Sequence, residues 1–414
     1  MINPKSRKYG LLGRKLSHSF SPLIHNMLDD YEYKLYEKES DELDRFLKST
    51  ELSGMNVTIP YKKAVIPYCV SLSENAKKLG SVNTLVKEDD GWHGYNTDYY
   101  GFCYMVKKSG IIIKGKKAIV LGSGGASLTV IQALNDLGAK KVIVISRTGE
   151  NNYENISLHY DAEIIVNTTP VGMYPDNMAC PIKLSDFKKC AGVIDLIYNP
   201  IKTKLLLDAK ELNIPHINGL SMLVAQAKKS AELFLKKDIC DTKIDIIEKS
   251  LEKNAQNIIL IGMPGCGKTT TGKMLSEMLG KEFIDCDKEI VKYKNMTIPE
   301  IFEKEGEEAF RKAEHEVIKE VSKKTGCIIA TGGGCVTREE NYPYLKQNGI
   351  VFWIKRNVEK LPTDDRPLSK KNNLLKMYEE RKPLYEKFCD YVIENQEEQF
   401  KTAETAKRIK EKLI

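Results

Sequence analysis

The stretch Ile258-Ile259-Leu260-Ile261-Gly262-Met263-Pro264-Gly265-Cys266-Gly267-Lys268-Thr269 decides the fold of the carboxyl-terminal part of the chain. Its aliphatic residues predict a buried strand, and the glycine-rich turn after them opens a helical pattern. The spacing is that of a P-loop, in which backbone amides cradle phosphates, the lysine reaches the terminal phosphates and a hydroxyl ligates Mg²⁺. We therefore expect a site for ATP or GTP with Mg²⁺, formed by Gly262, Gly265, Gly267, Lys268, Thr269 and Thr270, with Thr269 on the metal.

A second glycine-rich turn, Gly122-Ser123-Gly124-Gly125-Ala126, also follows an aliphatic run, Ala118–Leu121. A helical pattern over Thr129–Leu137 and a strand pattern over Lys141–Ile145 complete the βαβ half of a dinucleotide-binding fold. After the second strand an NAD site usually has an acid, whereas this chain has Ser146-Arg147-Thr148, which suits a 2′-phosphate. The pattern predicts an NADP(H) site formed by Gly122, Gly124, Gly125, Ala126, Ser146, Arg147 and Thr148.

The composition narrows the class of protein. The chain has 414 residues, of which 42% are hydrophobic and 29% charged, so at least two globular cores are expected. Its apolar runs fall short of the roughly 18 residues that a membrane span needs, and its first residues lack the apolar core of a signal peptide, which favours a cytoplasmic enzyme without a membrane partner. The ten cysteines form no Cys-x-x-Cys pair, so neither a disulfide framework nor a zinc site is indicated.

The charge pattern indicates small anionic partners rather than nucleic acid. The 64 basic residues only slightly exceed the 57 acidic ones, giving a formal net charge of +7, and the two kinds alternate along stretches such as Lys236–Lys253. A solvated, lysine-rich surface is therefore expected, with small-molecule substrates and no nucleic-acid face. The sequence leaves the oligomeric state open.

A charged stretch without glycine or proline, Lys236–Gln256, predicts a helical connector, and we place the domain boundary near Leu251. Residues 1–250 would form an α/β region and residues 251–414 a P-loop domain with a parallel sheet. Within the first region, residues 1–100 together with about 220–240 would form one subdomain, and residues 101–219 a Rossmann-like subdomain. The first subdomain should contain strands at Tyr9–Leu12, Met55–Ile59 and Val82–Leu85 and a helix at Pro22–Tyr31.

Further motifs occur in one order along residues 8–235. They are Ser17-His18-Ser19-Phe20-Ser21-Pro22, Asn56-Val57-Thr58-Ile59-Pro60-Tyr61-Lys62, Ser81-Val82-Asn83-Thr84, Asn96-Thr97-Asp98, Asn167-Thr168-Thr169-Pro170-Val171-Gly172-Met173, Asp195-Leu196-Ile197-Tyr198-Asn199-Pro200 and Gly219-Leu220-Ser221-Met222-Leu223-Val224-Ala225-Gln226. Together they closely resemble shikimate dehydrogenase. The resemblance implies a substrate-binding domain beside an NADP domain, and reduction of 3-dehydroshikimate to shikimate with NADPH.

The resemblance also implies a catalytic pair, Lys62 and Asp98. An ammonium can donate a proton to the oxygen that becomes an alkoxide as hydride arrives, and a nearby carboxylate orients and stabilises that cation. His18 is interpreted as structural or loop-forming rather than catalytic. The family's polar shell around its substrate would comprise Ser19, Ser21, Thr58, Asn83, Tyr198 and Gln226, while Gly219 would contact the cofactor. The chain departs from the family in lacking a second basic residue after Arg147 and in a short stretch before Asn167, where the usual covering helix is not predicted.

Two acids follow the P-loop at Asp285-Cys286-Asp287, where a strand is predicted over Lys281–Asp285. An i, i+2 spacing on a strand points both carboxylates to one face. Beside a P-loop, one of the two acids can hold the Mg²⁺ shell and the other can orient the attacking hydroxyl or accept its proton. We assign the first role to Asp285 and the second to Asp287.

Downstream motifs extend this pattern: Phe310-Arg311-Lys312-Ala313-Glu314, Thr331-Gly332-Gly333-Gly334, Asp365-Arg366-Pro367-Leu368 and Glu380-Arg381-Lys382-Pro383-Leu384-Tyr385. With the P-loop they strongly resemble shikimate kinase over about residues 257–414. The resemblance implies that shikimate is bound by Asp287, Arg311, Gly333, Gly334 and Arg381, with the arginines as forks for its carboxylate. Arg366, in a lid, would neutralise charge on the transferring phosphoryl group.

Both resemblances point to one metabolite, and we interpret the chain as a bifunctional enzyme of the shikimate pathway, which leads to chorismate and the aromatic amino acids. Its first region would reduce 3-dehydroshikimate with NADPH, and its second would phosphorylate the 3-hydroxyl of shikimate with MgATP. Three alternatives stay open: a quinate-preferring dehydrogenase, a metabolite-sensing binding protein and a fused kinase for another small molecule. A sensor needs a pocket but no group-transfer residues such as Lys62, Asp98, Lys268 and Asp287.

Overall fold

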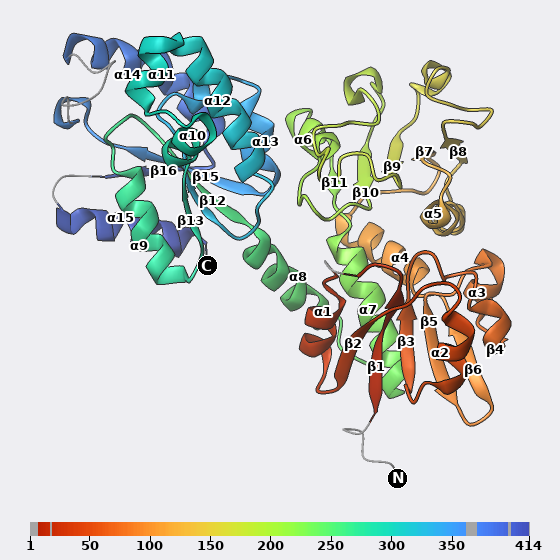
Figure 1. Cartoon of the computed structure of the whole chain (residues 1–414). Helices are drawn as coiled ribbons and strands as arrows, with labels where there is room; N and C mark the ends of the chain where they lie inside the picture. The colour runs from red at the N-terminus through yellow and green to blue at the C-terminus, as the bar shows by residue number, and fades with distance from the viewer. Residues whose placement is uncertain (1–6, 17–18, 362–370, 396–398, 414) are drawn as a thin grey trace. The chain divides into compact units, whose positions relative to one another are not determined.

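Two compact units make up the computed structural model of this chain, which describes residues 7–16, 19–361, 371–395 and 399–413 (Figure 1). Unit 1 consists of Met1–Val171, Cys180–Tyr198 and Asp208–Ser250. Unit 2 consists of Leu251–Ile414 together with two short segments, Gly172–Ala179 and Asn199–Leu207. Both units are α/β structures, as predicted.

A six-stranded mixed sheet opens unit 1, with the order β2-β1-β3-β5-β6-β4. Strand β1 is parallel to β2 and β3, while β5 is antiparallel to β3 and β6. The strands are β1 (Lys8–Gly13), β2 (Glu32–Glu37), β3 (Gly54–Val57), β4 (Cys69–Leu72), β5 (Thr84–Glu88) and β6 (Gly91–Tyr95), accompanied by the helices α1 (Ser21–Leu28), α2 (Leu43–Ser49) and α3 (Glu74–Leu79). Aliphatic and aromatic side chains of the strands and α2 form its core.

A five-stranded parallel sheet follows in unit 1, with the order β11-β10-β9-β7-β8. Strand β7 is buried along all but its first residue, as expected for a parallel strand covered on both faces. Strand order reverses at β7, where such sheets bind ligands beyond their carboxyl ends. The elements are β7 (Lys117–Leu121), α5 (Gly125–Asp136), β8 (Lys141–Ile145), β9 (Ile164–Asn167), β10 (Gly192–Asp195) and β11 (His216–Ile217). Helix α6 (Lys204–Glu211) begins in the segment Asn199–Leu207 of unit 2 and ends in unit 1.

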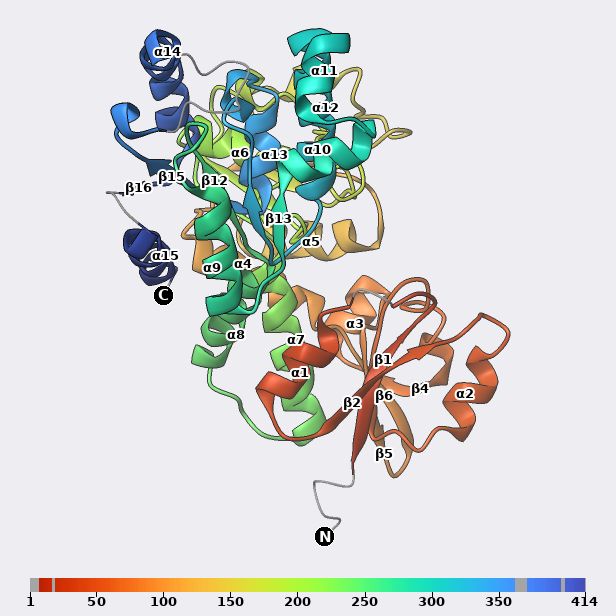
Figure 2. The same ribbon diagram turned by 60° about the vertical axis from the view of Figure 1, so that its left-hand side comes forward.

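Two helices of unit 1, α4 (Asp98–Ser109) and α7 (Leu220–Leu235), pack closely against each other (Figure 2). Gly101 permits this approach, because a Cβ at this position would lie 2.7 Å from the carbonyl oxygen of Met222. Phe102 and Met105 of α4 join Met222 in the core beneath the parallel sheet. The packing therefore fixes the start of α4 relative to the middle of α7, and α8 (Thr242–Ala255) follows in the chain.

Unit 2 is built on a five-stranded, all-parallel sheet with the order β13-β14-β12-β15-β16. The central strand β12 is buried along its whole length and contributes Ile258–Ile261 to the core. The strands are β12 (Asn257–Ile261), β13 (Phe283–Asp285), β14 (Ile328–Ala330), β15 (Gly349–Lys355) and β16 (Tyr391–Glu394). The helices are α9 (Lys268–Leu279), α10 (Cys286–Lys294), α11 (Ile298–Lys304), α12 (Gly306–Val321), α13 (Asn341–Gln347), α14 (Lys371–Phe388) and α15 (Gln399–Lys412).

Most predicted elements are present, with shifted boundaries. Strand β8 has the predicted limits. Strand β3 ends at Val57 rather than Ile59, because Pro60 has no N–H for a ladder. The predicted connector is interrupted, because Lys236 adopts a left-handed conformation that ends α7, and α8 begins only at Thr242. The boundaries of α1, α5, β5 and β13 also differ from those predicted.

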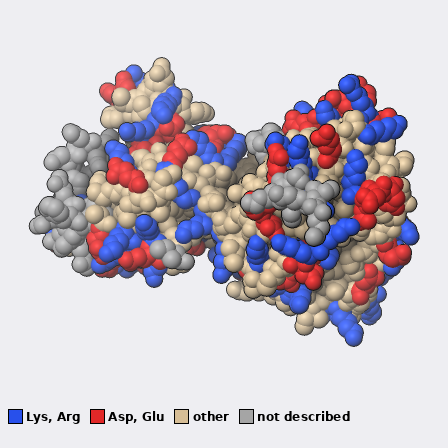
Figure 3. All heavy atoms as spheres, turned by 90° about the horizontal axis from the view of Figure 1, so that it is seen from below, with Lys and Arg blue, Asp and Glu red and all other residues tan. Residues whose placement is uncertain are grey.

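Basic and acidic side chains are interspersed on the face of the molecule seen in Figure 3. All ten cysteines are free thiols. Within the described ranges, no helix is long and apolar enough to cross a membrane.

Substitution of Gly101 by alanine tests the packing of α4 on α7. The added Cβ meets backbone of Met222, which cannot move aside as a flexible side chain would. Overpacking of this kind costs about 1–3 kcal/mol. We expect the free energy of unfolding of Gly101→Ala to fall by that amount in chemical denaturation. In the control Gly125→Ala, where the added Cβ meets nothing within 4 Å, it should change by less than about 0.5 kcal/mol; equal stability of both variants would contradict the packing described.

Candidate active sites

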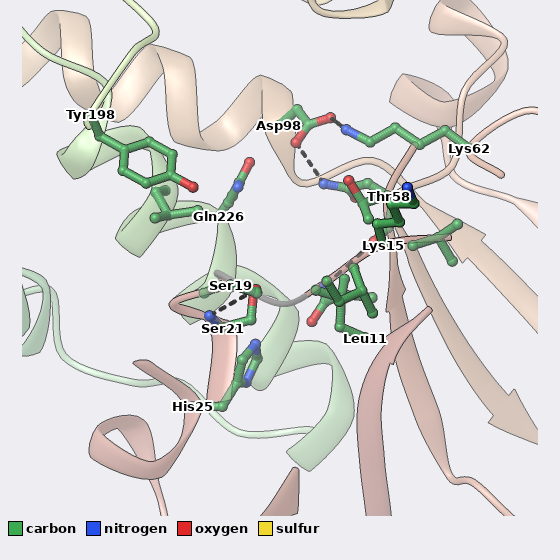
Figure 4. A pocket seen from close by; sticks show the side chains of 16 residues that line it. Leu11, Lys15, Ser19, Ser21, His25, Thr58, Lys62, Asp98, Tyr198 and Gln226 are labelled. Carbon is green, nitrogen blue, oxygen red and sulfur yellow. Dashed lines mark hydrogen bonds and ion pairs between the residues drawn. The ribbon is translucent and has the colours of Figure 1, made fainter. Parts of the chain in front are cut away.

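A cavity of about 480 Å³ lies in unit 1, where the carboxyl ends of β1 and β3 meet α1, α4 and α7 (Figure 4). Hydroxyls, amides and one ion pair make up most of its polar lining. All residues predicted for catalysis and substrate binding in this region line it: Ser19, Ser21, Thr58, Lys62, Asn83, Asp98, Tyr198 and Gln226. His18 lies outside the described residues.

Lys62 and Asp98 form an ion pair at the edge of this cavity, with Lys62 Nζ 2.7 Å from Asp98 Oδ2. The lysine follows the turn after β3, and the aspartate is the first residue of α4, where the helix dipole favours a negative charge. The side chain of Lys62 is 31% exposed and that of Asp98 only 11%, so the ammonium faces the cavity while the carboxylate holds it from behind. An ammonium fixed in this way can donate a proton to a bound oxygen atom.

Asn83 fixes the other oxygen of the aspartate, because its Nδ2 donates to Asp98 Oδ1 at 2.8 Å. The orientation of the Asn83 amide is set by the backbone N–H of Thr97, which donates to Asn83 Oδ1 at 2.8 Å. A main-chain N–H can only donate, so the amide cannot flip without losing this bond. Asn83 therefore positions Asp98 as well as lining the cavity.

The opposite wall of the cavity presents neutral polar groups. The Oε1 atom of Gln226 is buried and has no hydrogen-bond partner in the described structure, which leaves it available to a ligand. Burial raises the pKa of Tyr198, so its hydroxyl stays protonated and can donate. The Ser21 N–H donates to Ser19 Oγ at 3.2 Å, which shapes the loop that carries both hydroxyls. Such groups suit a polyhydroxylated ligand.

His25 lines the cavity and was missed by the sequence analysis. Its ring stacks on Tyr33 at a centroid distance of 3.8 Å, and its Nδ1 lies 2.6 Å from Tyr31 Oη. Burial lowers the pKa of His25 to about 3, so the ring is neutral at physiological pH. It therefore acts as a packing and hydrogen-bonding group rather than a cation.

The glycine-rich turn after β7 is shaped for a close ligand. Gly122 has a positive φ of 102°, and a Cβ there would lie 2.9 Å from Thr168 Oγ1. The space above Gly124 and Gly125 is open, and both residues, with Ala126, are exposed at the amino terminus of α5. Backbone N–H groups at such a terminus bind phosphates, so the turn fits the diphosphate of a dinucleotide.

The neighbouring strand β8 ends at the same edge of the sheet, because β7 and β8 are parallel and paired in register. Arg147 and Thr148 are exposed there, whereas Ser146 is mostly buried. A guanidinium beside the turn fits a 2′-phosphate. Between β8 and β9 the chain forms only a short 3₁₀ helix, Ile156–His159. This agrees with the sequence analysis, which did not predict the family's usual covering helix in this stretch. Gly219 lies near the end of β10, and a Cβ there would collide with the carbonyl of Leu196.

The P-loop of unit 2 has the geometry that phosphate binding requires. Gly262, Gly265 and Gly267 have φ values of 141°, 81° and 103°, which favour glycine. Lys268 Nζ donates to the carbonyl oxygens of Gly262 at 2.8 Å and Met263 at 3.0 Å, which holds the ammonium over the loop. The amides at the start of α9, including that of exposed Thr270, complete the cradle.

The two acids after the P-loop do not share a strand face, which corrects the sequence prediction. Asp285 ends β13, and Asp287 lies in the first turn of α10 because Asp285 caps that helix, with its Oδ1 accepting from the Asp287 N–H at 3.1 Å. The Oδ2 of Asp285 accepts from Thr269 Oγ1 at 3.0 Å. A hydroxyl and a carboxylate in contact are the oxygen donors that Mg²⁺ prefers, so this pair fits the metal. Asp287 is turned toward Gly332 instead.

Arg311 and Arg381 are both only 8% exposed, so neither is an ordinary surface arginine. Arg311 Nη1 donates to Glu314 Oε2 at 2.8 Å, and its guanidinium lies against Gly334, where a Cβ would collide with it. Arg381 Nη1 donates to the carbonyl oxygen of Gly333 at 3.1 Å. Both guanidinium groups therefore lie against the same glycine run, Gly333 and Gly334, as binding of one carboxylate by the two arginines requires.

Glu314 is a member of this cluster that the sequence analysis did not single out. It is fully buried, its Oε1 has no hydrogen-bond partner in the described structure, and a Cβ on Gly332 would collide with that atom. Burial raises the pKa of Glu314, and the nearby Asp287 acts in the same direction while Arg311 opposes it. Its i, i+3 spacing from Arg311 on α12 was the signal that could have identified it.

A second cavity, of about 300 Å³, adjoins the P-loop. Arg356 Nη1 donates to the carbonyl oxygen of Gly265 at 3.3 Å, and Asn395 Nδ2 donates to that of Cys266 at 2.8 Å. The cavity is lined by Lys355, Arg356, Asn357, Val358, Lys360, Tyr378, Glu394 and Asn395. Arg366 and the predicted lid lie outside the described residues.

Comparison with known families supports both halves of the sequence analysis. The family described as "Shikimate dehydrogenase substrate binding domain" matches residues 11–85, and the family described as "Shikimate kinase" matches residues 264–413. The residues of β1 and β3 that line the cavity of unit 1 lie within the first match. Most of the P-loop and both buried arginines, Arg311 and Arg381, lie within the second.

Individual relatives extend the first match. The shikimate dehydrogenase (NADP(+)) of Clostridium beijerinckii is 42% identical over 246 residues, which are 55% of this chain and 91% of that protein. The crystal structure of a chorismate mutase/shikimate 5-dehydrogenase fusion protein from Clostridium acetobutylicum is similar with a TM-score of 0.57 and 37% identity, covering 60% of this chain and 97% of that one. A quinate dehydrogenase from Corynebacterium glutamicum in complex with NAD has a TM-score of 0.54 and 26% identity, covering 59% and 98%.

Substitution of Asp285 by asparagine separates its capping role from its metal role. Asparagine still caps α10, so the melting temperature should not change, whereas loss of the charge should weaken the Mg²⁺-dependent part of ATP binding by about tenfold or more. Isothermal titration with ATP, with and without Mg²⁺, measures this difference. Asp285→Ala should lose about 1 kcal/mol of stability in addition. Unchanged MgATP affinity in both variants would contradict the metal assignment.

Proposed function

This chain belongs to the shikimate dehydrogenase family and has a shikimate kinase domain, and from this premise we propose that its two sites act on the same small acid, shikimate, through the residues described above. The chain is a bifunctional enzyme of the shikimate pathway, with an NADP-dependent dehydrogenase and an ATP-dependent kinase. The observation that carries the proposed residue roles is the ion pair of Lys62 and Asp98, which opens onto a cavity lined by hydroxyls and amides.

In the first reaction, 3-dehydroshikimate is reduced to shikimate. Bound NADPH supplies the hydride that reaches the carbonyl carbon. Lys62 donates the proton from Nζ to the carbonyl oxygen as negative charge develops there, so that one hydride and one proton yield the new hydroxyl. Asp98 keeps the ammonium of Lys62 aimed at that oxygen, because its Oδ2 accepts from Lys62 Nζ. Asn83 holds the carboxylate in place by donating to its other oxygen, Oδ1. The reverse reaction returns the proton to Lys62.

Substrate recognition in unit 1 follows from the neutral groups of the cavity. The unpartnered Oε1 of Gln226 accepts from a substrate hydroxyl, and the protonated Tyr198 donates to the substrate. The hydroxyls of Ser19, Ser21 and Thr58 can donate or accept, which suits a ring with several hydroxyls and a carboxylate. NADPH would be held by the glycine turn at the start of α5, with Arg147 on its 2′-phosphate.

In the second reaction, the 3-hydroxyl of shikimate attacks the γ-phosphorus of ATP. Asp287 accepts the hydroxyl proton while the new O–P bond forms and the bond to the bridging oxygen breaks, which leaves ADP. Arg311 and Arg381 hold the carboxylate of shikimate, and buried Glu314 fixes Arg311 from behind. Lys268 stabilises charge on the phosphates. Thr269 and Asp285 would hold Mg²⁺, which would neutralise further phosphate charge, and Arg366 would join them in this role.

A quinate-preferring dehydrogenase is the one second candidate that an observation favours, because a quinate dehydrogenase is among the similar structures. Hydroxyls such as those of Ser19 and Ser21 can serve one additional substrate hydroxyl without a change of charge. The ratio of kcat/KM for shikimate and quinate with NADP decides between them. Higher kcat/KM for shikimate supports the main proposal.

Two single substitutions test whether the sites have the proposed residues. Lys62→Ala removes the proton donor and should lower dehydrogenase kcat by about 100-fold or more, while kinase turnover stays within twofold. Lys268→Ala should show the reverse pattern, because it removes the phosphate-binding ammonium. Spectrophotometric assay of NADPH and coupled assay of ADP on the same preparations measure both. Loss of both activities in either variant would contradict independent sites.

A further inference from the structure

Ser230 of α7 lies at the centre of a buried network behind the catalytic pair. It is completely buried, yet its hydroxyl contacts groups from three other parts of unit 1. Asn56 Nδ2 of β3 donates to Ser230 Oγ at 2.8 Å, and the hydroxyls of Thr84 and Thr97 lie 2.9 and 3.1 Å away. Ser230 Oγ itself donates to the carbonyl oxygen of Gln226, one turn earlier, at 2.9 Å. No role for this residue follows from the motifs.

One assignment of the protons satisfies every group of this network. Ser230 has one proton, which goes to the Gln226 carbonyl, so its two lone pairs accept from Asn56 Nδ2 and the Thr97 hydroxyl. Asn56 is oriented for this by Tyr33, whose hydroxyl donates to Asn56 Oδ1 at 2.8 Å. The second hydrogen of Asn56 Nδ2 reaches Thr84 Oγ1 at 3.1 Å.

The same assignment leads directly to the catalytic aspartate. Thr84 donates to Asn83 Oδ1 at 3.1 Å, and Thr97 Oγ1 accepts from Asn83 Nδ2 at 3.0 Å. The other hydrogen of Asn83 Nδ2 is then left for Asp98 Oδ1. Because Ser230 takes the Thr97 proton, the Thr97 oxygen stays turned toward Asn83 as an acceptor. Without Ser230, the Thr97 hydroxyl is free to turn and donate to Asn83 Oδ1, 3.3 Å away.

We propose that Ser230 is a positioning residue of the dehydrogenase, which fixes Asn83 and Asp98 on one side of the cavity relative to Gln226 on the other. This inference rests on the proposed function of Lys62 and Asp98. Ser230 ties the helix that carries Gln226 to the strand ends that carry the polar network, so the distance between the substrate-binding amide and the proton donor is set at this hydroxyl. Buried polar groups that are all satisfied hold one arrangement, whereas a partly satisfied network does not.

The test is Ser230→Ala in the full chain, assayed for NADPH-dependent reduction with NADPH and with NADPH deuterated at the transferred position. We expect kcat to fall about tenfold, because misplacement of reacting groups by about 1 Å can cost up to ~100-fold. The KM for NADPH should stay within twofold, and the deuterium isotope effect on kcat should rise as the chemical step becomes slower. Kinase turnover of the same sample should match that of the parent, which reports that the chain is intact.

Two further variants keep the inference falsifiable. Thr84→Val removes a hydroxyl of the same network and should lower kcat with an effect that is not additive to that of Ser230→Ala. Ala231→Gly weakens the same helix one residue away without touching the network, and should leave kcat per folded molecule and the isotope effect unchanged. If Ser230→Ala behaves like Ala231→Gly, the residue is only structural. If Lys62→Ala also retains parental kcat, it is the proposed function that fails rather than the role of Ser230.

Discussion

Charged groups that are withdrawn from water must find partners, and this constraint shapes both sites of the molecule. In unit 1 the carboxylate of Asp98 is nearly buried, so one oxygen is held by Lys62 and the other by Asn83. Asn83 donates to the Thr97 hydroxyl, which in turn contacts Ser230 on α7, more than a hundred residues later in the chain. The close packing of α4 on α7 at Gly101 brings these segments within hydrogen-bond distance. Fold and site are therefore consequences of the same contacts.

Unit 2 meets the constraint in another way. Arg311 and Arg381 are taken out of water next to a run of glycines, where the absence of Cβ atoms lets guanidinium and carboxylate groups lie against backbone. Arg311 is held by Glu314, and Arg381 by a carbonyl oxygen. In unit 1 mostly neutral polar groups line the cavity beside one ion pair, whereas in unit 2 arginines line the site. The first arrangement suits proton transfer at a carbonyl. The second suits binding of a substrate that carries a carboxylate and receives a phosphoryl group from a neighbouring nucleotide.

Local patterns were sufficient to predict the strand–turn–helix units around Gly122 and Gly262, because an aliphatic run followed by a glycine turn depends on neighbouring residues only. They were insufficient for Asp287, because Asp285 caps a helix that begins at Cys286, so the i, i+2 spacing of a strand does not apply to the two acids. Ser230 and Glu314 carry no motif of their own, since a buried hydroxyl or carboxylate gains its role from partners far away in sequence. The family resemblances supplied Lys62 and Asp98 as a pair, which spacing alone does not connect.

The central claim is that one chain converts 3-dehydroshikimate through shikimate to shikimate 3-phosphate. Mass-spectrometric analysis of products after incubation of the purified chain with 3-dehydroshikimate, NADPH and MgATP tests it most directly, beside mixtures that omit one nucleotide each. We predict shikimate 3-phosphate only in the complete mixture, and shikimate alone when ATP is omitted. Shikimate that is never phosphorylated in the complete mixture, or the absence of both products, would contradict the claim.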